Sequence, residues 1–136
     1  MQKPFGRELL LDIYGCSKNL SDIGAGSEFL SEAVIELDMY EQSRPYVIKS
    51  PLSYINRKGK VVNCPTKDGL SGCVLLIESA ITIHTLAPKK FVSLNFYTCG
   101  QMDEEMAAKM LKLTKKYFGW KKEEHQILDR GVTYNK

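Results

Sequence analysis

Hydrophobic and polar positions alternate along most of the chain, which predicts a protein built mainly of strands. In residues 8–14 the side chains of Leu9, Leu11 and Ile13 fall on one face, as on a half-buried strand. The polar residues 56–69 contain two glycines and a proline and predict a hairpin or a long loop. Further extended segments are predicted at residues 40–49, 72–77, 81–86, 91–98 and 124–130.

Two segments carry apolar residues at helical spacing instead. One helix is predicted to start near Ser27, whose hydroxyl can cap the first turn. A second is predicted to begin at the cap residue Asp103 and to end at Gly119, with lysines gathered near its end. The stripe of the first helix contains Phe29, Leu30, Ala33, Val34 and Leu37, and that of the second Met106, Met110, Leu113 and Tyr117.

Six strands and two helices in this order predict an α+β fold. We expect a two-layer sandwich, an antiparallel β-sheet with the two main helices on one face. The other face of the sheet is then left to solvent, to a ligand or to a second copy of the chain. Because the chain has 136 residues and no linker, we expect one domain that spans residues 1–136.

Composition excludes several classes of protein. With 43% hydrophobic residues the chain is not disordered, and its net charge of +3, without a basic stripe, argues against a nucleic-acid partner. No apolar run is long enough to span a membrane, and Glu8 and Asp12 lie where a signal peptide needs apolar residues. Four cysteines without a CxxC pair and two histidines predict no metal site. Because no secretion signal is visible, we expect reduced thiols and a cytoplasmic location.

Small reactive residues occur at and near the ends of adjacent predicted strands. Ser71 precedes one strand, Glu78 and Ser79 lie between two strands, His84 lies on the second, and Cys99 follows the third. Because strands of a hairpin are neighbours, we expect these side chains to be able to face one pocket. The alternative is structural: Cys99 packs in the core, His84 makes a buried hydrogen bond, and Ser79 is a turn residue.

At these residues the chain resembles the small prokaryotic S-adenosylmethionine decarboxylase proenzymes. That family carries a Glu-Ser-x-x-x-Ile-His segment and a Thr-Cys-Gly segment, which match residues 78–84 and 98–100. The histidine and the cysteine follow Ser79 by five and twenty residues, as in the family. Further similar segments run nearly from end to end: Gly6-Arg7, Tyr14-Gly15-Cys16, Gly69-Leu70-Ser71-Gly72 and Arg130-Gly131.

The resemblance implies that the chain cleaves itself between Glu78 and Ser79, into residues 1–78 and 79–136. Ser79 would then become a pyruvoyl group, the cofactor, whose carbonyl forms a Schiff base with a small-molecule substrate and draws electrons during decarboxylation. Ser71 would support the acyl shift and His84 the elimination, whereas Cys99 would return a proton during turnover. The family also implies a homodimer with active sites at the subunit interface and a role in polyamine (spermidine) biosynthesis.

The chain departs from the family where substrate is bound. An aromatic-Pro-Glu segment is usual after the His-Thr pair, but here the residues are Leu86, Ala87 and Pro88, and Asp12 replaces the usual Glu. Candidate substrate-binding residues are therefore Asp12, Leu86 and Tyr54, with Tyr46 or Phe91 as other possible aromatic partners and Asp68 as another carboxylate. The altered residues leave two alternatives to S-adenosylmethionine decarboxylation: arginine or ornithine decarboxylation, or a non-catalytic, regulatory role.

Overall fold

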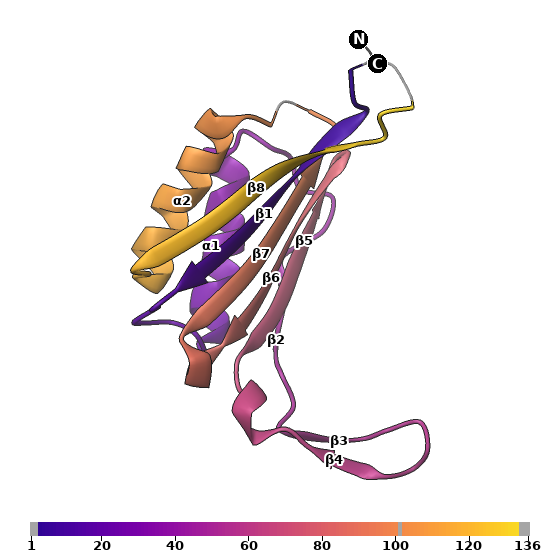
Figure 1. Cartoon of the computed structure of the whole chain (residues 1–136), viewed down its shortest axis with the longest axis vertical. Helices are drawn as coiled ribbons and strands as arrows, with labels where there is room; N and C mark the ends of the chain where they lie inside the picture. The colour runs from indigo at the N-terminus through magenta and orange to yellow at the C-terminus, as the bar shows by residue number, and fades with distance from the viewer. Residues whose placement is uncertain (1–2, 101, 134–136) are drawn as a thin grey trace.

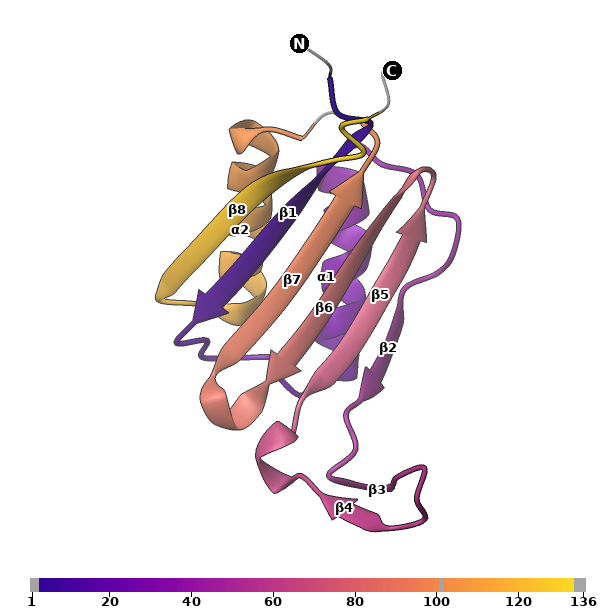
Figure 2. The ribbon, with the colours of Figure 1, turned by 45° about the vertical axis from the view of Figure 1, so that its right-hand side comes forward.

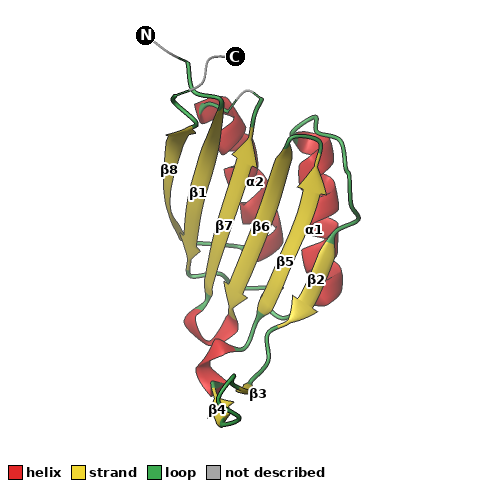
Figure 3. Cartoon of the chain, turned by 90° about the vertical axis from the view of Figure 1, so that its right-hand side faces the viewer, coloured by secondary structure: helices red, strands yellow, loops and turns green. Residues whose placement is uncertain are grey.

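The computed structural model describes residues 3–100 and 102–133, which form two layers. A six-stranded antiparallel sheet has the order β2-β5-β6-β7-β1-β8, and two helices cover one of its faces (Figures 1 and 3). The predicted α+β class and two-layer arrangement are therefore confirmed. The sheet consists of β1 (Gly6–Tyr14), β2 (Tyr46–Lys49), β5 (Leu70–Leu76), β6 (Ser79–Leu86), β7 (Phe91–Thr98) and β8 (Lys122–Arg130).

Alternation along the strands divides the sheet into a helix face and an open face. Side chains on the helix face are buried against α1 (Ile23–Glu36) and α2 (Glu104–Phe118). They include Leu9, Leu11 and Ile13 of β1, as the alternation predicts, and Val92, Leu94 and Phe96 of β7. Because a slip of one residue would move this whole set to the other face, burial of the core determines the register of the strands.

Helix α1 starts one turn earlier than predicted. Asp22, not Ser27, is the N-cap, and its carboxylate accepts a hydrogen bond from the Ala25 N–H at 3.0 Å. Gly24 and Gly26 lie at the start of the helix, so its apolar pattern becomes visible only from Phe29 onward. The predicted start was wrong for this reason. The predicted apolar stripe of this helix is buried throughout.

Helix α2 has the predicted ends. The Asp103 carboxylate accepts a hydrogen bond from the Met106 N–H at 3.0 Å, which satisfies one of the free donors of the first turn. At the other end Gly119 adopts a left-handed conformation (φ +60°) and donates its N–H to the Lys115 carbonyl. Lys115 and Lys116 lie in the last turn, where they complement the helix dipole.

A small hairpin extends from the end of the main sheet (Figures 1 and 2). It consists of β3 (Ser53–Ile55) and β4 (Val61–Asn63), which form a separate two-stranded sheet. The expectation of a hairpin or long loop in residues 56–69 is therefore only partly met, because the segment holds the turn and β4 whereas β3 lies wholly before it. The extended segment predicted at 40–49 is shorter than expected, because only Tyr46–Lys49, after Pro45, forms a strand of the main sheet.

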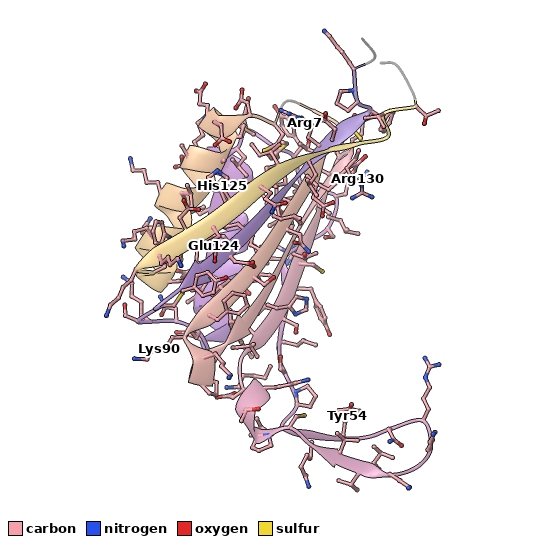
Figure 4. The ribbon with its side chains drawn as sticks, viewed as in Figure 1. Arg7, Tyr54, Lys90, Glu124, His125 and Arg130 are labelled. Atoms are coloured by element: carbon pink, nitrogen blue, oxygen red, sulfur yellow. The ribbon has the colours of Figure 1, made fainter. Side chains whose placement is uncertain are left out.

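His125 ties the edge strand β8 to helix α2 (Figure 4). Its Nδ1 lies 2.8 Å from the Glu123 carboxylate, and its Nε2 lies 3.0 Å from the carboxylate of Glu104, in the first turn of α2. Hydrogen bonds to these two carboxylates, first Glu123 and then Glu104, raise the pKa of His125 above its usual value. The protonated ring therefore holds two anions on separate elements.

The described part of the chain has neither a membrane-spanning helix nor a metal-binding cluster. No helix within residues 3–100 and 102–133 is long and apolar enough to cross a membrane. The same residues contain no group of three or more His, Cys, Asp or Glu side chains arranged to hold a metal ion.

Gly69, just before β5, has no room for a side chain. A Cβ atom there would lie 1.9 Å from the carbonyl oxygen of Thr85. We predict that Gly69→Ala lowers the free energy of unfolding by more than about 3 kcal/mol, the upper part of the usual overpacking range, because backbone must move. Gly59→Ala is the control: its Cβ meets no atom within 4 Å, and the cost is limited to its positive φ, roughly 1–2 kcal/mol. Equal losses in urea unfolding would contradict this account.

The His125 contacts predict a pH-dependent contribution to stability. Because the pKa of His125 is higher in the folded chain, the contribution is complete below the unfolded value of about 6.5 and is lost as pH rises through the folded pKa. His125→Gln should therefore lower the free energy of unfolding more at about pH 5.5 than at about pH 8.5, as measured by urea unfolding at both pH values. Glu104→Gln should weaken this dependence, and a pH-independent effect of His125→Gln would be contrary to it.

Candidate active site

The turn between β5 and β6 holds the predicted cleavage position in a strained conformation. Leu76 and Ser79 pair across the hairpin, and Ile77 and Glu78 form the turn. Glu78 has a φ of +59°, in the left-handed region that side-chain-bearing residues seldom adopt. This conformation costs roughly 1–2 kcal/mol for an ordinary residue. Strain of this size thus lies at the residue whose carbonyl would be attacked.

The Glu78 carbonyl is held by the neighbouring strand end. Its oxygen accepts a hydrogen bond from the backbone N–H of Cys99 at 3.1 Å. A backbone N–H aimed at a carbonyl oxygen stabilises the negative charge that develops there during attack by a nucleophile. The sequence identifies Cys99 as a candidate by its thiol, but its N–H contact depends on the register between β6 and β7, which the sequence does not reveal.

Ser79 is oriented by a residue that sequence reasoning missed. The Ser79 hydroxyl donates to Thr98 Oγ1 at 2.8 Å, and the same oxygen accepts the Gly100 N–H at 2.9 Å. Thr98 is buried and continues the alternation of the helix-facing residues of β7. Its pairing with Ser79 depends on the register of β6 and β7, which the sequence does not reveal. In the sequence, only its place beside Cys99 in the Thr-Cys-Gly segment could have pointed to Thr98.

The Cys99 side chain belongs to the open face of the sheet. Its Sγ lies 3.6 Å from Tyr97 Oη, and the Arg130 guanidinium lies over the Tyr97 ring and pairs with Glu8. The hydrogen bond to Cys99, together with burial, raises the pKa of Tyr97 above its usual value. Tyr97 is thus a neutral phenol near neutral pH and can exchange a hydrogen bond with the thiol.

Ser71 and His84 form a second group on the open face. They are directly paired across β5 and β6, and Ser71 Oγ lies 3.1 Å from His84 Nδ1. Ser50 Oγ is 3.4 Å from Ser71 Oγ on the other side. A pocket of about 210 Å³ lies over this pair and is lined by Tyr46, Ile48, Ser71, Gly72, Cys73, Thr82 and His84.

One chain does not bring these two groups together. Ser79 and His84 lie five residues apart on β6, which corresponds to roughly 17 Å along a strand. An odd separation also places their side chains on opposite faces of the sheet. The expectation that Ser71, Ser79, His84 and Cys99 face one pocket within a single chain is therefore wrong. Strands of a hairpin are neighbours only at matching positions, and Ser79 and His84 are near opposite ends.

The candidate substrate-binding residues lie at three separate places. Asp12 joins the Ser71–His84 group across the sheet, because His84 pairs with Ser93, Ser93 with Asp12, and Asp12 with Glu124. Glu124 also accepts a hydrogen bond from Tyr14 and so raises the pKa of that tyrosine. These pairings form a polar row across the open face, with two carboxylates at one end.

The other two candidates lie beyond this row. Leu86 ends β6 opposite Phe91, whose ring packs on Tyr14 with centroids 5.3 Å apart. Tyr54 lies on the β3–β4 hairpin, half exposed and far from the polar row within the same chain (Figure 4). Of the other residues considered, Tyr46 lines the pocket, whereas Asp68 pairs with Lys49 at 3.7 Å.

Comparison with known proteins identifies relatives of the whole chain. The family model for S-adenosylmethionine decarboxylase matches residues 7–131. The S-adenosylmethionine decarboxylase proenzyme of Archaeoglobus fulgidus is 30% identical over 126 residues, which cover 93% of this chain and 97% of that protein. S-adenosylmethionine decarboxylase proenzyme 2 of Bacillus cereus is 31% identical over 108 residues, 76% and 72% of the two chains.

Two further matches support narrower conclusions, one because its sequence identity is low and the other because it covers a short segment. The crystal structure of the adenosylmethionine decarboxylase from Aquifex aeolicus superposes with a TM-score of 0.67 over 98% of this chain and 97% of that one. At 24% identity this likeness supports the fold. The arginine decarboxylase proenzyme of Pyrobaculum arsenaticum is 43% identical, but over only 42 residues, 31% of this chain and 32% of that protein.

Proposed function

Because the chain belongs to the S-adenosylmethionine decarboxylase family, we propose that it cleaves itself at Glu78–Ser79 and then decarboxylates S-adenosylmethionine through a pyruvoyl group at position 79. The observation that carries this proposal is the geometry at the β5–β6 turn. A left-handed Glu78 presents its carbonyl oxygen to the Cys99 N–H, and the next residue is a serine whose hydroxyl is oriented by Thr98.

Self-cleavage begins with an acyl shift between adjacent residues. Ser79 Oγ attacks the Glu78 carbonyl carbon, the C–N bond breaks, and the serine proton passes to the released amine, so that an ester replaces the amide. The Cys99 N–H stabilises the oxyanion, an effect whose loss slows comparable reactions about 10²–10³-fold. The shift also passes the link between Glu78 and β6 through the Ser79 side chain, and the longer link gives Glu78 room to leave its positive φ.

The second stage needs a base at the α-carbon of Ser79. Removal of the α-proton expels the Glu78 carboxylate and leaves a dehydroalanine, and water then releases ammonia to give the new keto group. His84 is the base, and Ser71, bound to His84 Nδ1, orients the ring so that Nε2 takes the proton. His84 of the same chain lies roughly 17 Å away along the strand and cannot reach this atom, so the base comes from a second chain.

A homodimer therefore completes each site. We infer a closed two-fold pairing in which the open faces meet, so that Ser71 and His84 of the partner reach the α-carbon of Ser79 from the side on which Cys99 lies. Exposed apolar side chains on the open face support this pairing: Tyr46, Ile48, Leu75 and Leu128. The four cysteines are free, which is in keeping with the predicted cytoplasmic location.

Position 79 fits the cofactor, because Ser79 bonds to the Thr98 hydroxyl and directly follows Glu78, whose carbonyl accepts the Cys99 N–H. A pyruvoyl group there would supply the electron-withdrawing carbonyl that decarboxylation of an amine substrate needs. Cys99 then returns a proton to the substrate carbon, and the neutral Tyr97 phenol beside it positions the thiol. Asp12 and Glu124 favour a cationic substrate such as a sulfonium.

Arginine remains the second candidate substrate, since a guanidinium would suit the same carboxylates and Leu86 offers no stacking surface for an adenine. The observation that favours it is the short match to an arginine decarboxylase proenzyme. The longer matches are to S-adenosylmethionine decarboxylase proenzymes, which makes S-adenosylmethionine the leading choice. Tyr54 is the aromatic residue we assign to the adenine.

The cleavage geometry predicts the outcome for the wild-type chain and for variants at Ser79 and Thr98. Wild-type protein should yield fragments 1–78 and 79–136 on denaturing mass spectrometry, the smaller one blocked at its N-terminus, and Ser79→Ala should stay intact. Thr98→Val should slow cleavage roughly tenfold, since loss of one buried hydrogen bond costs about 1–3 kcal/mol. Thr98→Ser, which keeps the hydroxyl, serves as the control. An intact wild-type chain with a free serine would refute the proposal.

Cys99→Ala should separate cleavage from turnover. The variant keeps the backbone N–H on Glu78, so cleavage should proceed, but decarboxylation should fall about 10²–10⁴-fold with the proton donor removed. Carbon dioxide release from S-adenosylmethionine, arginine and ornithine is measured side by side on cleaved protein. Release from an amino acid alone would overturn the leading substrate, and cleaved protein inactive on all three would favour the regulatory alternative.

A further inference from the structure

The β3–β4 hairpin projects away from the rest of its own chain. It leaves the main sheet beyond β2 and extends past the end of the sheet, toward the side opposite the helices (Figures 1 and 2). Every residue of β3 is exposed. We use the name arm for residues 52–63, which comprise this hairpin and the residue before it.

The arm is well formed even though little of the chain packs against it. The Asn56 side chain accepts the N–H groups of Lys58 and Lys60 at 2.9 and 3.0 Å, and the Asn56 N–H bonds to the Lys60 carbonyl. At the base the Cys64 N–H bonds to the Leu52 carbonyl at 2.7 Å. Specific hydrogen bonds thus hold the turn, although a lone two-stranded hairpin is only marginally stable in water.

Apolar side chains of the arm are open to solvent. The exposed fractions are 51% for Leu52, 50% for Tyr54, 71% for Ile55 and 66% for Val61. Ile55 and Val61 pair across the hairpin and share one of its faces, whereas Tyr54 belongs to the other. Exposed apolar side chains gathered in this way are of the kind that marks a contact with another protein. The arm also follows directly from β2, whose Tyr46 and Ile48 are exposed on the open face.

The tip of the arm has a charge that the open face complements. Arg57, Lys58 and Lys60 lie within four residues of one another, and none forms an ion pair within residues 3–100 and 102–133. The open face carries Asp12 and Glu124 at the end of its polar row. Opposite charges of this kind steer and orient two surfaces that meet.

We propose that the arm packs on a second copy of this chain, its apolar side chains against the partner and its cationic tip toward the carboxylates of the partner's open face. This inference rests on the dimer in the proposed function and adds a contact to it. In a two-fold pair each arm packs on the other chain, so the same contact is made twice. The two arms thereby set the relative position of the two half-sites.

The test compares substitutions on the arm with a matched one elsewhere. Ile55→Asp together with Val61→Asp should raise the dissociation constant of the dimer at least tenfold in sedimentation experiments over a range of concentrations. Ile35→Asp is the control, because Ile35 on α1 is 77% exposed but lies on the helix layer. Arg57→Glu with Lys58→Glu should weaken the dimer in the same direction, and circular dichroism checks that each variant folds.

A photo-reactive amino acid at position 55 gives a second readout that needs no destabilising change. It should cross-link two chains, whereas the same group at position 35 should not. An unchanged dissociation constant in the arm variants, a monomeric wild-type chain, or no cross-link from position 55 would each overturn the inference. Failure of the proposed function has another signature: wild-type chains that dimerise through the arm but neither cleave nor release carbon dioxide.

Discussion

The antiparallel pairing of β6 with β5 and β7 is the constraint from which the geometry of the site follows. Burial of alternate residues on the helix face determines the register, and the register then brings Ser79 opposite Thr98 and His84 opposite Ser71. The same pairing ends at the Ile77–Glu78 turn, where the Cys99 N–H meets the Glu78 carbonyl. Core packing and the chemistry of cleavage therefore depend on one arrangement of strands.

This arrangement also divides the reactive residues into two half-sites. A strand is stiff and extended, so Ser79 and His84 remain apart and on opposite faces however the side chains turn. Under the proposed function, this division accounts for an open face that combines a polar row with exposed apolar side chains: the face would meet another chain and also admit a charged substrate. On this account dimerisation is a requirement for chemistry.

Much of the fold could be predicted from the sequence, because alternation and helix caps are local signals. The strand at 91–98 and the caps Asp103 and Gly119 are found as expected. The start of α1 could not be found, because Gly24 and Gly26 interrupt its apolar pattern, and the roles of Thr98 and the Cys99 N–H depend on cross-strand register. The short motifs identify reactive residues, but they contain no information on which chain supplies each one.

Complementation between two inactive variants tests the central claim that the half-sites come from different chains. A Ser79→Ala chain and a His84→Ala chain, each expected to stay intact alone, are co-expressed with different tags and purified as a hybrid. The account predicts that the His84→Ala chain is cleaved in the hybrid, so that mass spectrometry finds fragment 79–136 with alanine at position 84. If that chain stays intact in a verified hybrid while wild type cleaves, the half-sites belong to one chain and the account is contradicted.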